Sequence, residues 1–186
     1  MRCDAFYLFC NHNDKYGANM TVEEQSRVLH ELQQADGRVK KAIRYITPKN
    51  GIILACAKTD AKDQTGIAVS CNGSIGFGVD ETVSRVLITV RRFNQDICAV
   101  GCICLNDVIA ETVKEIFIDV GEYDVEKFPK GISTMEWGVS FLCKTGVPMA
   151  ICAKNELKEG GCIYIFGETP NDVVNRILII SERLKI

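Results

Sequence analysis

A pattern that occurs twice constrains the fold more than any other feature of this sequence. Residues 66–93 and residues 146–184 each contain two short apolar runs separated by a turn, followed by apolar side chains at helical spacing. In the first copy the turn is Asn72-Gly73, a pair that favours the positive φ angles of a type I′ hairpin turn. In the second copy Thr169 and Pro170 open the helical stretch as a candidate N-cap and first-turn proline. Both copies therefore predict a β-hairpin followed by a helix.

The two copies lie in register, which indicates a duplicated unit. Arg85 and Arg176 occupy the same place in the two copies, about half the chain apart. Apolar runs at Asp4–Cys10 and Asp96–Leu105 extend the match toward the beginning of each half. We therefore expect an α/β fold, of the α+β variant, in which two tandem similar units pack into one pseudo-symmetric globule. The units are residues 1–94 and 95–186, and chance similarity of two hairpin–helix pieces is the alternative.

Within each unit we expect the order β-α, one undecided element, then β-β-α. The first helices are predicted at Thr21–Ala35 and Asp107–Val120, where apolar residues recur at helical spacing. The undecided elements cover residues 51–58 and 135–144. Short apolar runs of this kind fit a strand and a helix equally well, so periodicity leaves both open.

Composition and charge exclude several classes of protein. Hydrophobic residues make up 47% of the chain and charged residues 25%, which is typical of a folded domain and not of a disordered segment. The formal net charge of −2, with both signs well mixed, offers no basic surface for nucleic acid or an anionic membrane. The first apolar run is too short for a secretory signal, and no run approaches the roughly 20 residues of a membrane span. We therefore expect a cytoplasmic protein.

Ten cysteines are the most unusual feature of the composition. In a reducing compartment they are expected to be free, and buried thiols behave as small hydrophobic side chains. Such a thiol content fits an anaerobic or otherwise strongly reducing host. Cys98, Cys102 and Cys104 would share one face of a strand, so a metal or iron–sulfur protein is one alternative. Their spread along the strand and the lack of a fourth ligand favour core thiols, and we expect no metal and no cofactor.

The sequence contains no established catalytic motif. No dinucleotide-binding glycine motif, P-loop, zinc-protease helix or nucleophile elbow occurs. Cys10 and His12 are neighbours after the first apolar run, so a cysteine-dependent enzyme using a thiol near His12 is a second alternative.

Three residues are candidates for a ligand-binding site or an interface. Arg85 and Arg176 recur within otherwise apolar helices, where a guanidinium either forms a structural ion pair or holds a partner or an anionic ligand. Trp137 is the single tryptophan. Tryptophan is usually a core or interface residue, and a place in the wall of a pocket is the alternative.

Local patterns give two partial resemblances to known families. Gly146-Val147-Pro148 before a predicted strand resembles the Gly-x-Pro segment of thioredoxin-like proteins, but the C-x-x-C motif that would imply their activity is absent. The two halves are also similar to tandem shell proteins of bacterial microcompartments in length and element types. Neither resemblance implies an activity or a site for this chain.

These observations favour a non-enzymatic duplicated module that self-assembles or binds a small ligand between its halves. Duplication creates a pseudo-twofold cleft or interface, and no catalytic motif argues for chemistry. We expect a homo-oligomer with a possible small-molecule ligand, and no nucleic-acid or membrane partner.

Overall fold

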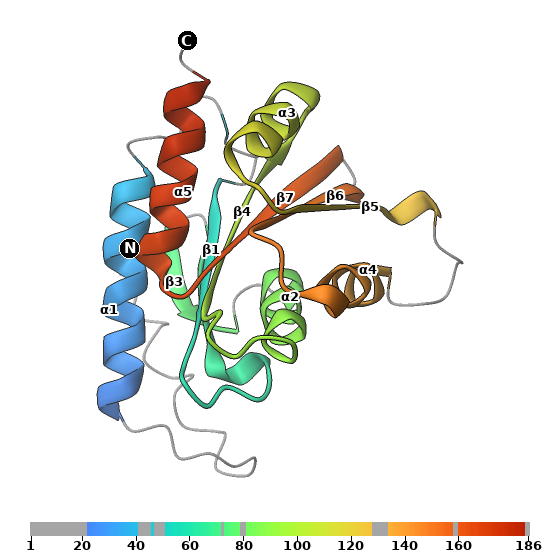
Figure 1. Cartoon of the computed structure of the whole chain (residues 1–186). Helices are drawn as coiled ribbons and strands as arrows, with labels where there is room; N and C mark the ends of the chain where they lie inside the picture. Colours follow the sequence, from blue (N-terminus) through green and yellow to red (C-terminus); the bar gives the residue numbers. More distant parts are fainter. Residues whose placement is uncertain are drawn as a thin grey trace, which may run out of the picture.

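The chain folds around a mixed β-sheet with helices on both faces. The computed structural model describes residues 22–40, 46, 51–71, 73–78, 81–127, 134–157 and 160–184. The strands found there are β1 (Ile53–Ala57), β2 (Ile67–Cys71), β3 (Ser74–Phe77), β4 (Ala99–Leu105), β5 (Val120–Asp124), β6 (Ala150–Leu157) and β7 (Gly160–Gly167). Their order across the sheet is β3-β2-β1-β4-β7-β6-β5 (Figure 1). Neighbouring strands are antiparallel, except that β5 runs parallel to β6.

Helices cover the two faces of this sheet. One face carries α1 (Val22–Val39), α3 (Asp107–Ile116) and α5 (Pro170–Arg183), and the other carries α2 (Glu81–Arg91) and α4 (Thr134–Leu142) (Figure 1). Short 3₁₀ turns are η1 (Gln64–Gly66), η2 (Val125–Lys127) and η3 (Cys143–Thr145). Because side chains alternate along a strand, Ile163 and Ile165 of β7 face the first core, whereas Tyr164 faces the second. The described part of the chain therefore has two cores separated by the sheet.

Both predicted hairpins and the cap of the last helix are confirmed. β2 pairs with β3 across a turn in which Gly73 has a φ of 82°. β6 pairs with β7 in the same antiparallel way. Thr169 caps α5 in a reciprocal capping box with Asp172, and Pro170 begins the helix.

The structure decides the two undecided elements in opposite ways. Residues 51–58 contain strand β1, whereas residues 135–144 form α4 and the start of η3. The helix predicted to reach Val120 ends at Ile116, and Val120 instead begins β5. The strand predicted at Asp4–Cys10 lies outside the described residues.

The mixed α/β fold is confirmed, but the two tandem units are not. Helix α2 packs its apolar side into one core and α5 packs into the other, so the matched hairpin–helix pieces lie on opposite faces of the sheet. The strand next to the hairpin also differs, because β1 is antiparallel to β2 whereas β5 is parallel to β6. One continuous sheet crosses the division at residues 94 and 95 through the pairing of β1 with β4. Within the described ranges, no helix is long and apolar enough to span a membrane.

Candidate functional site

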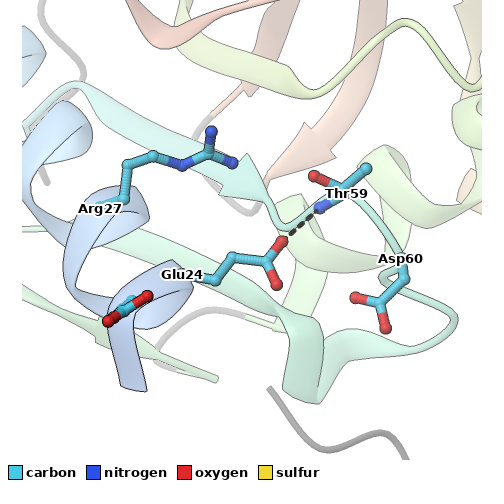
Figure 2. Close-up of a pocket in the computed structure, with 5 residues that line it drawn as sticks. Glu24, Arg27, Thr59 and Asp60 are labelled. Carbon is cyan, nitrogen blue, oxygen red and sulfur yellow. Dashed lines mark hydrogen bonds between the residues drawn. The ribbon is translucent and has the colours of Figure 1, made fainter. Parts of the chain in front are cut away.

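A hollow of about 490 Å³ lies where β1 ends, between the first turns of α1 and the loop that follows the strand (Figure 2). Glu23, Glu24 and Arg27 line it from α1, and Thr59 and Asp60 line it from the loop. We call residues 58–63 the site loop. Its size falls within the range of about 300–1,000 Å³ that small-molecule sites occupy.

Helix α1 presents its three polar residues to the hollow because of its amphipathic pattern. Residues three and four apart share a helix face, which brings Arg27 beside Glu23 and Glu24. Val28 and Leu32 point the other way and are buried in the first core, which fixes the rotation of the helix. Figure 2 shows Glu24 reaching the site loop, where its Oε1 atom accepts a hydrogen bond of 3.1 Å from the N–H of Thr59.

Side-chain interactions and one close glycine contact hold the conformation of the site loop. Lys58 is only 5% exposed, and its Nζ atom lies 2.9 Å from Oδ1 of Asp60. The hydrogen bond from Lys58 holds the pKa of the Asp60 carboxyl below its usual range. Asp63 accepts hydrogen bonds from the N–H and the hydroxyl of Thr65, which start η1. A Cβ atom at Gly66 would lie 2.8 Å from Cβ of Ala61, so the loop closes on a position that only glycine fits.

Charge in the hollow is divided between one guanidinium and three carboxylates. The Asp60 carboxylate is paired with Lys58, and Glu24 accepts from Thr59. Arg27 is exposed, and among the described residues no hydrogen bond or ion pair holds its guanidinium. The site can therefore take an anionic group at Arg27 and a cationic group beside the carboxylates.

The structure does not bring the three candidate residues from the sequence together. Arg85 and Arg176 lie on α2 and α5, on opposite sides of the sheet. The Arg176 guanidinium donates to the carbonyl oxygen of Phe166, which ties α5 to the end of β7. Trp137 on α4 is 46% exposed and stacks on Phe141 with ring centroids 5.5 Å apart. None of the three is among the residues found to line the hollow, and their roles stay predictions.

The expected row of three thiols is only partly present, because Cys98 precedes β4. Cys102 and Cys104 lie opposite Tyr164 and Cys162 of β7, two residues of the second core, so they share that face of the strand, and the half-buried Cys104 also packs against the first core. Within the ranges described, no group of three His, Cys, Asp or Glu side chains is placed to hold a metal ion. Cys10 and His12 lie outside those ranges.

Sequence reasoning missed all five residues of the hollow. Glu23 and Glu24 were visible only as acidic residues in the first turn of a helix, where they also complement the helix dipole. The polar run from Lys58 to Asp63 was the one available signal, because polar residues directly after a buried strand often carry function.

Comparison with known proteins finds a matching family model and a similar curated protein. The family model described as thiamine-phosphate synthase ThiN matches residues 26–179. A bifunctional thiamine biosynthesis protein, ThiDN, from Methanocaldococcus jannaschii is 25% identical, and the match covers 90% of this chain and 43% of that protein. The chain thus spans less than half the length of this curated relative.

Two solved structures share the fold. The C-terminal domain of protein MJ0236 has a TM-score of 0.78 and 24% identity, covering 87% of this chain and 97% of that domain. The C-terminal domain of a phosphomethylpyrimidine kinase has a TM-score of 0.75 and 22% identity, covering 84% of this chain and all of that domain (100%).

These matches correct the function expected from the sequence. A non-enzymatic, self-assembling duplicated module is contradicted by a family model that describes a synthase and covers most of the chain. The two alternatives built on a cysteine near His12 and on Cys98, Cys102 and Cys104 are overturned by the same finding. The family match also takes the place of the two partial resemblances noted from the hairpin–helix ends. The chain belongs to the thiamine-phosphate synthase ThiN family.

Proposed function

We propose that this chain forms thiamine phosphate and that its reactants bind in the hollow beside Arg27. The match to the synthase family over residues 26–179 carries the proposal, because that range includes the whole sheet, three of the helices in full, and Arg27, Thr59 and Asp60 of the hollow. The names of the relatives support the same reaction class, since one is a bifunctional thiamine biosynthesis protein.

The product determines the bond that the enzyme must make. Thiamine phosphate joins a pyrimidine to a thiazolium ring through one methylene carbon, and the phosphate is an ester on the thiazole side. The synthase step therefore forms a bond between the thiazole nitrogen and the methylene carbon, while a phosphorylated leaving group departs from that carbon with the bonding electrons. A kinase acting on a phosphomethylpyrimidine, as named for one structural relative, is the kind of enzyme that prepares such a leaving group.

In the proposed reaction the two kinds of charge in the hollow would have different roles. Arg27 supplies a planar, permanently charged donor that matches phosphate oxygens. Glu23 and Glu24 would supply negative charge for the ring nitrogen, which becomes cationic as the bond forms. The step needs positioned charge and proximity more than proton transfer, which fits a site without histidine among its five described residues.

The test is synthesis of thiamine phosphate by the purified protein from thiazole phosphate and the diphosphate of the hydroxymethylpyrimidine, detected by mass spectrometry. We expect product from the wild type and a rise of roughly 10- to 100-fold in KM for Arg27→Gln, since a charge-assisted hydrogen bond to phosphate contributes about 1.5–3 kcal/mol.

Arg38→Gln is the matched control. Arg38 lies on the same helix and loses the same charge, but its guanidinium bonds to Asn171 and Asn175 on α5 and not to the hollow. A wild type that neither makes nor binds thiamine phosphate would overturn the proposed function. Equal KM values for the two variants would remove Arg27 from the site.

A further inference from the structure

Arg91, the last residue of α2, is buried and fully engaged although it carries a permanent charge. It is 7% exposed. One terminal nitrogen donates to the carbonyl oxygens of Gln95 and Ile97, each at 3.1 Å, and to Sγ of Cys98 at 2.8 Å. The other donates to the carbonyl oxygen of Thr59 at 2.8 Å. A single guanidinium therefore joins the end of α2, the approach to β4 and the site loop.

Thr59 is consequently held from both sides of the sheet. Its N–H donates to Glu24 on α1, and its C=O accepts from Arg91 on α2. Because α1 and α2 pack on opposite faces, this one residue links the two helical layers at the edge of the hollow. A shift of the Thr59 peptide would move the Glu24 carboxylate and the adjacent Asp60 together.

We propose that Arg91 is a positioning residue of the synthase site, which fixes the site loop in its binding geometry without touching the reactants. A guanidinium suits this position because its two terminal nitrogens lie in a rigid planar fork and reach Thr59 and residues 95–98 at the same time, the three acceptors around one nitrogen sharing its two N–H groups. A lysine side chain has a single terminal nitrogen, which can reach only some of the four acceptors. The inference rests on the proposed function for the identity of the ligand, but the positioning itself is a property of the free protein.

The experiment combines amide hydrogen exchange with binding of thiamine phosphate, using Arg91→Lys, Arg91→Met and the control Arg92→Met. Arg92 is the next residue in the chain, is exposed and carries the same charge. We expect exchange at Thr59 to accelerate at least tenfold in Arg91→Met and less in Arg91→Lys, while the strands of the core keep their protection. The dissociation constant for thiamine phosphate should rise roughly tenfold in Arg91→Met, with partial recovery in Arg91→Lys.

Amide exchange at Thr59 tests the positioning role of Arg91, and binding of thiamine phosphate by the wild type tests the proposed function. Unchanged exchange at Thr59 in both Arg91 variants would overturn the positioning role, whatever the ligand. Accelerated exchange at Thr59 with a dissociation constant equal to that of Arg92→Met would also overturn it, because the loop would then be free to move without consequence. Failure of the wild type to bind thiamine phosphate would count against the proposed function alone, and exchange would still decide whether Arg91 fixes the loop. If Arg91→Met loses core protection as well, Arg91→Lys provides the comparison.

Discussion

Cys56, Cys143 and Cys152 lie in apolar surroundings, and their chemistry follows from that burial. Burial raises the pKa of Cys56 to about 12 and the pKa values of Cys143 and Cys152 to about 11. At neutral pH roughly one such thiol in ten thousand or fewer is ionised, and the thiolate is the reactive form. Iodoacetamide should therefore leave all three unmodified in the native protein and modify them in concentrated guanidinium chloride, as measured by peptide mass mapping. Rapid alkylation of native Cys56 would contradict the burial.

The structural role of a single residue could be predicted from the sequence where that role depends on near neighbours in the chain. Thr169 and Asp172 form the cap of α5 through neighbours a few residues away, and Gly73 takes the left-handed turn that its hairpin requires. Arg27 has no such signature. It lines the hollow together with Thr59, which lies in a loop far along the chain, and that proximity exists only in the folded protein. The cysteines show a similar limit, since the spacing could not reveal that the strand begins at Ala99, after Cys98.

At the scale of elements, Glu122 joins α3, β5 and β6 through two lysines. Its carboxylate oxygens lie 2.7 Å from Nζ of Lys114 and 2.5 Å from Nζ of Lys154. Hydrogen bonds from Lys114 and then Lys154 lower the pKa of Glu122. A carboxyl group with a lowered folded-state pKa adds stability above its unfolded pKa of about 4.3, and that stability is lost as the pH falls through the folded-state value.

Glu122→Gln should therefore lower the urea midpoint near neutral pH and have little effect in strong acid, where the wild-type carboxyl is protonated too. The loss should be modest, because all three side chains are partly exposed and solvent screens the pair. Glu126→Gln is the control, since Glu126 is exposed in the adjacent turn η2. A midpoint difference that persists unchanged in acid would show that packing, and not the ion pairs, accounts for the effect.

Element types were predictable where turn or cap residues marked them or where apolar spacing extended over a long run, as in α1 and α3, and not in short apolar runs. The runs at 51–58 and 135–144 looked alike, yet one became β1 and the other α4. Strand β1 is paired on both sides, with β2 and β4, and those partners are distant or undetectable from its own five residues. Strand β5 was missed because Val-Gly-Glu-Tyr-Asp has little apolar content, and its stability comes from parallel pairing with β6 and cover from Leu142.

For the whole molecule, the repeat in the sequence does not determine how its two copies are arranged in space. Two hairpin–helix pieces can share apolar spacing and an arginine, yet pack their helices on opposite faces of one sheet. The spacing records which side of each helix is apolar, but the connection to the sheet decides which face that side covers. The α/β class therefore followed from the pattern, whereas the pseudo-symmetric arrangement did not.

Strand β4 carries the connection between the two halves, because it pairs with β1 on one side and β7 on the other. Gly101 lies in the middle of this strand beneath α5. A Cβ atom there would lie 2.7 Å from Cγ1 of Val173 and 2.9 Å from Cδ1 of Ile177. Gly101→Ala should therefore force α5 away from the sheet and destabilise the whole fold by about 1–3 kcal/mol, as overpacking of a core typically does.

Gly37→Ala is the matched control for the same chemical change. Gly37 lies on the exposed side of α1, and a Cβ atom there would have no heavy atom within 4 Å. Alanine in a helix interior is favoured over glycine by about 0.5–1 kcal/mol, so this variant should be stabilised. Urea unfolding followed by circular dichroism should show the midpoints moving in opposite directions, each in a single transition, because β4 lies between its partners in one continuous sheet. If Gly101→Ala unfolds in two steps, with only the strands after β4 affected, the two halves are separately stable and the sheet does not unite them.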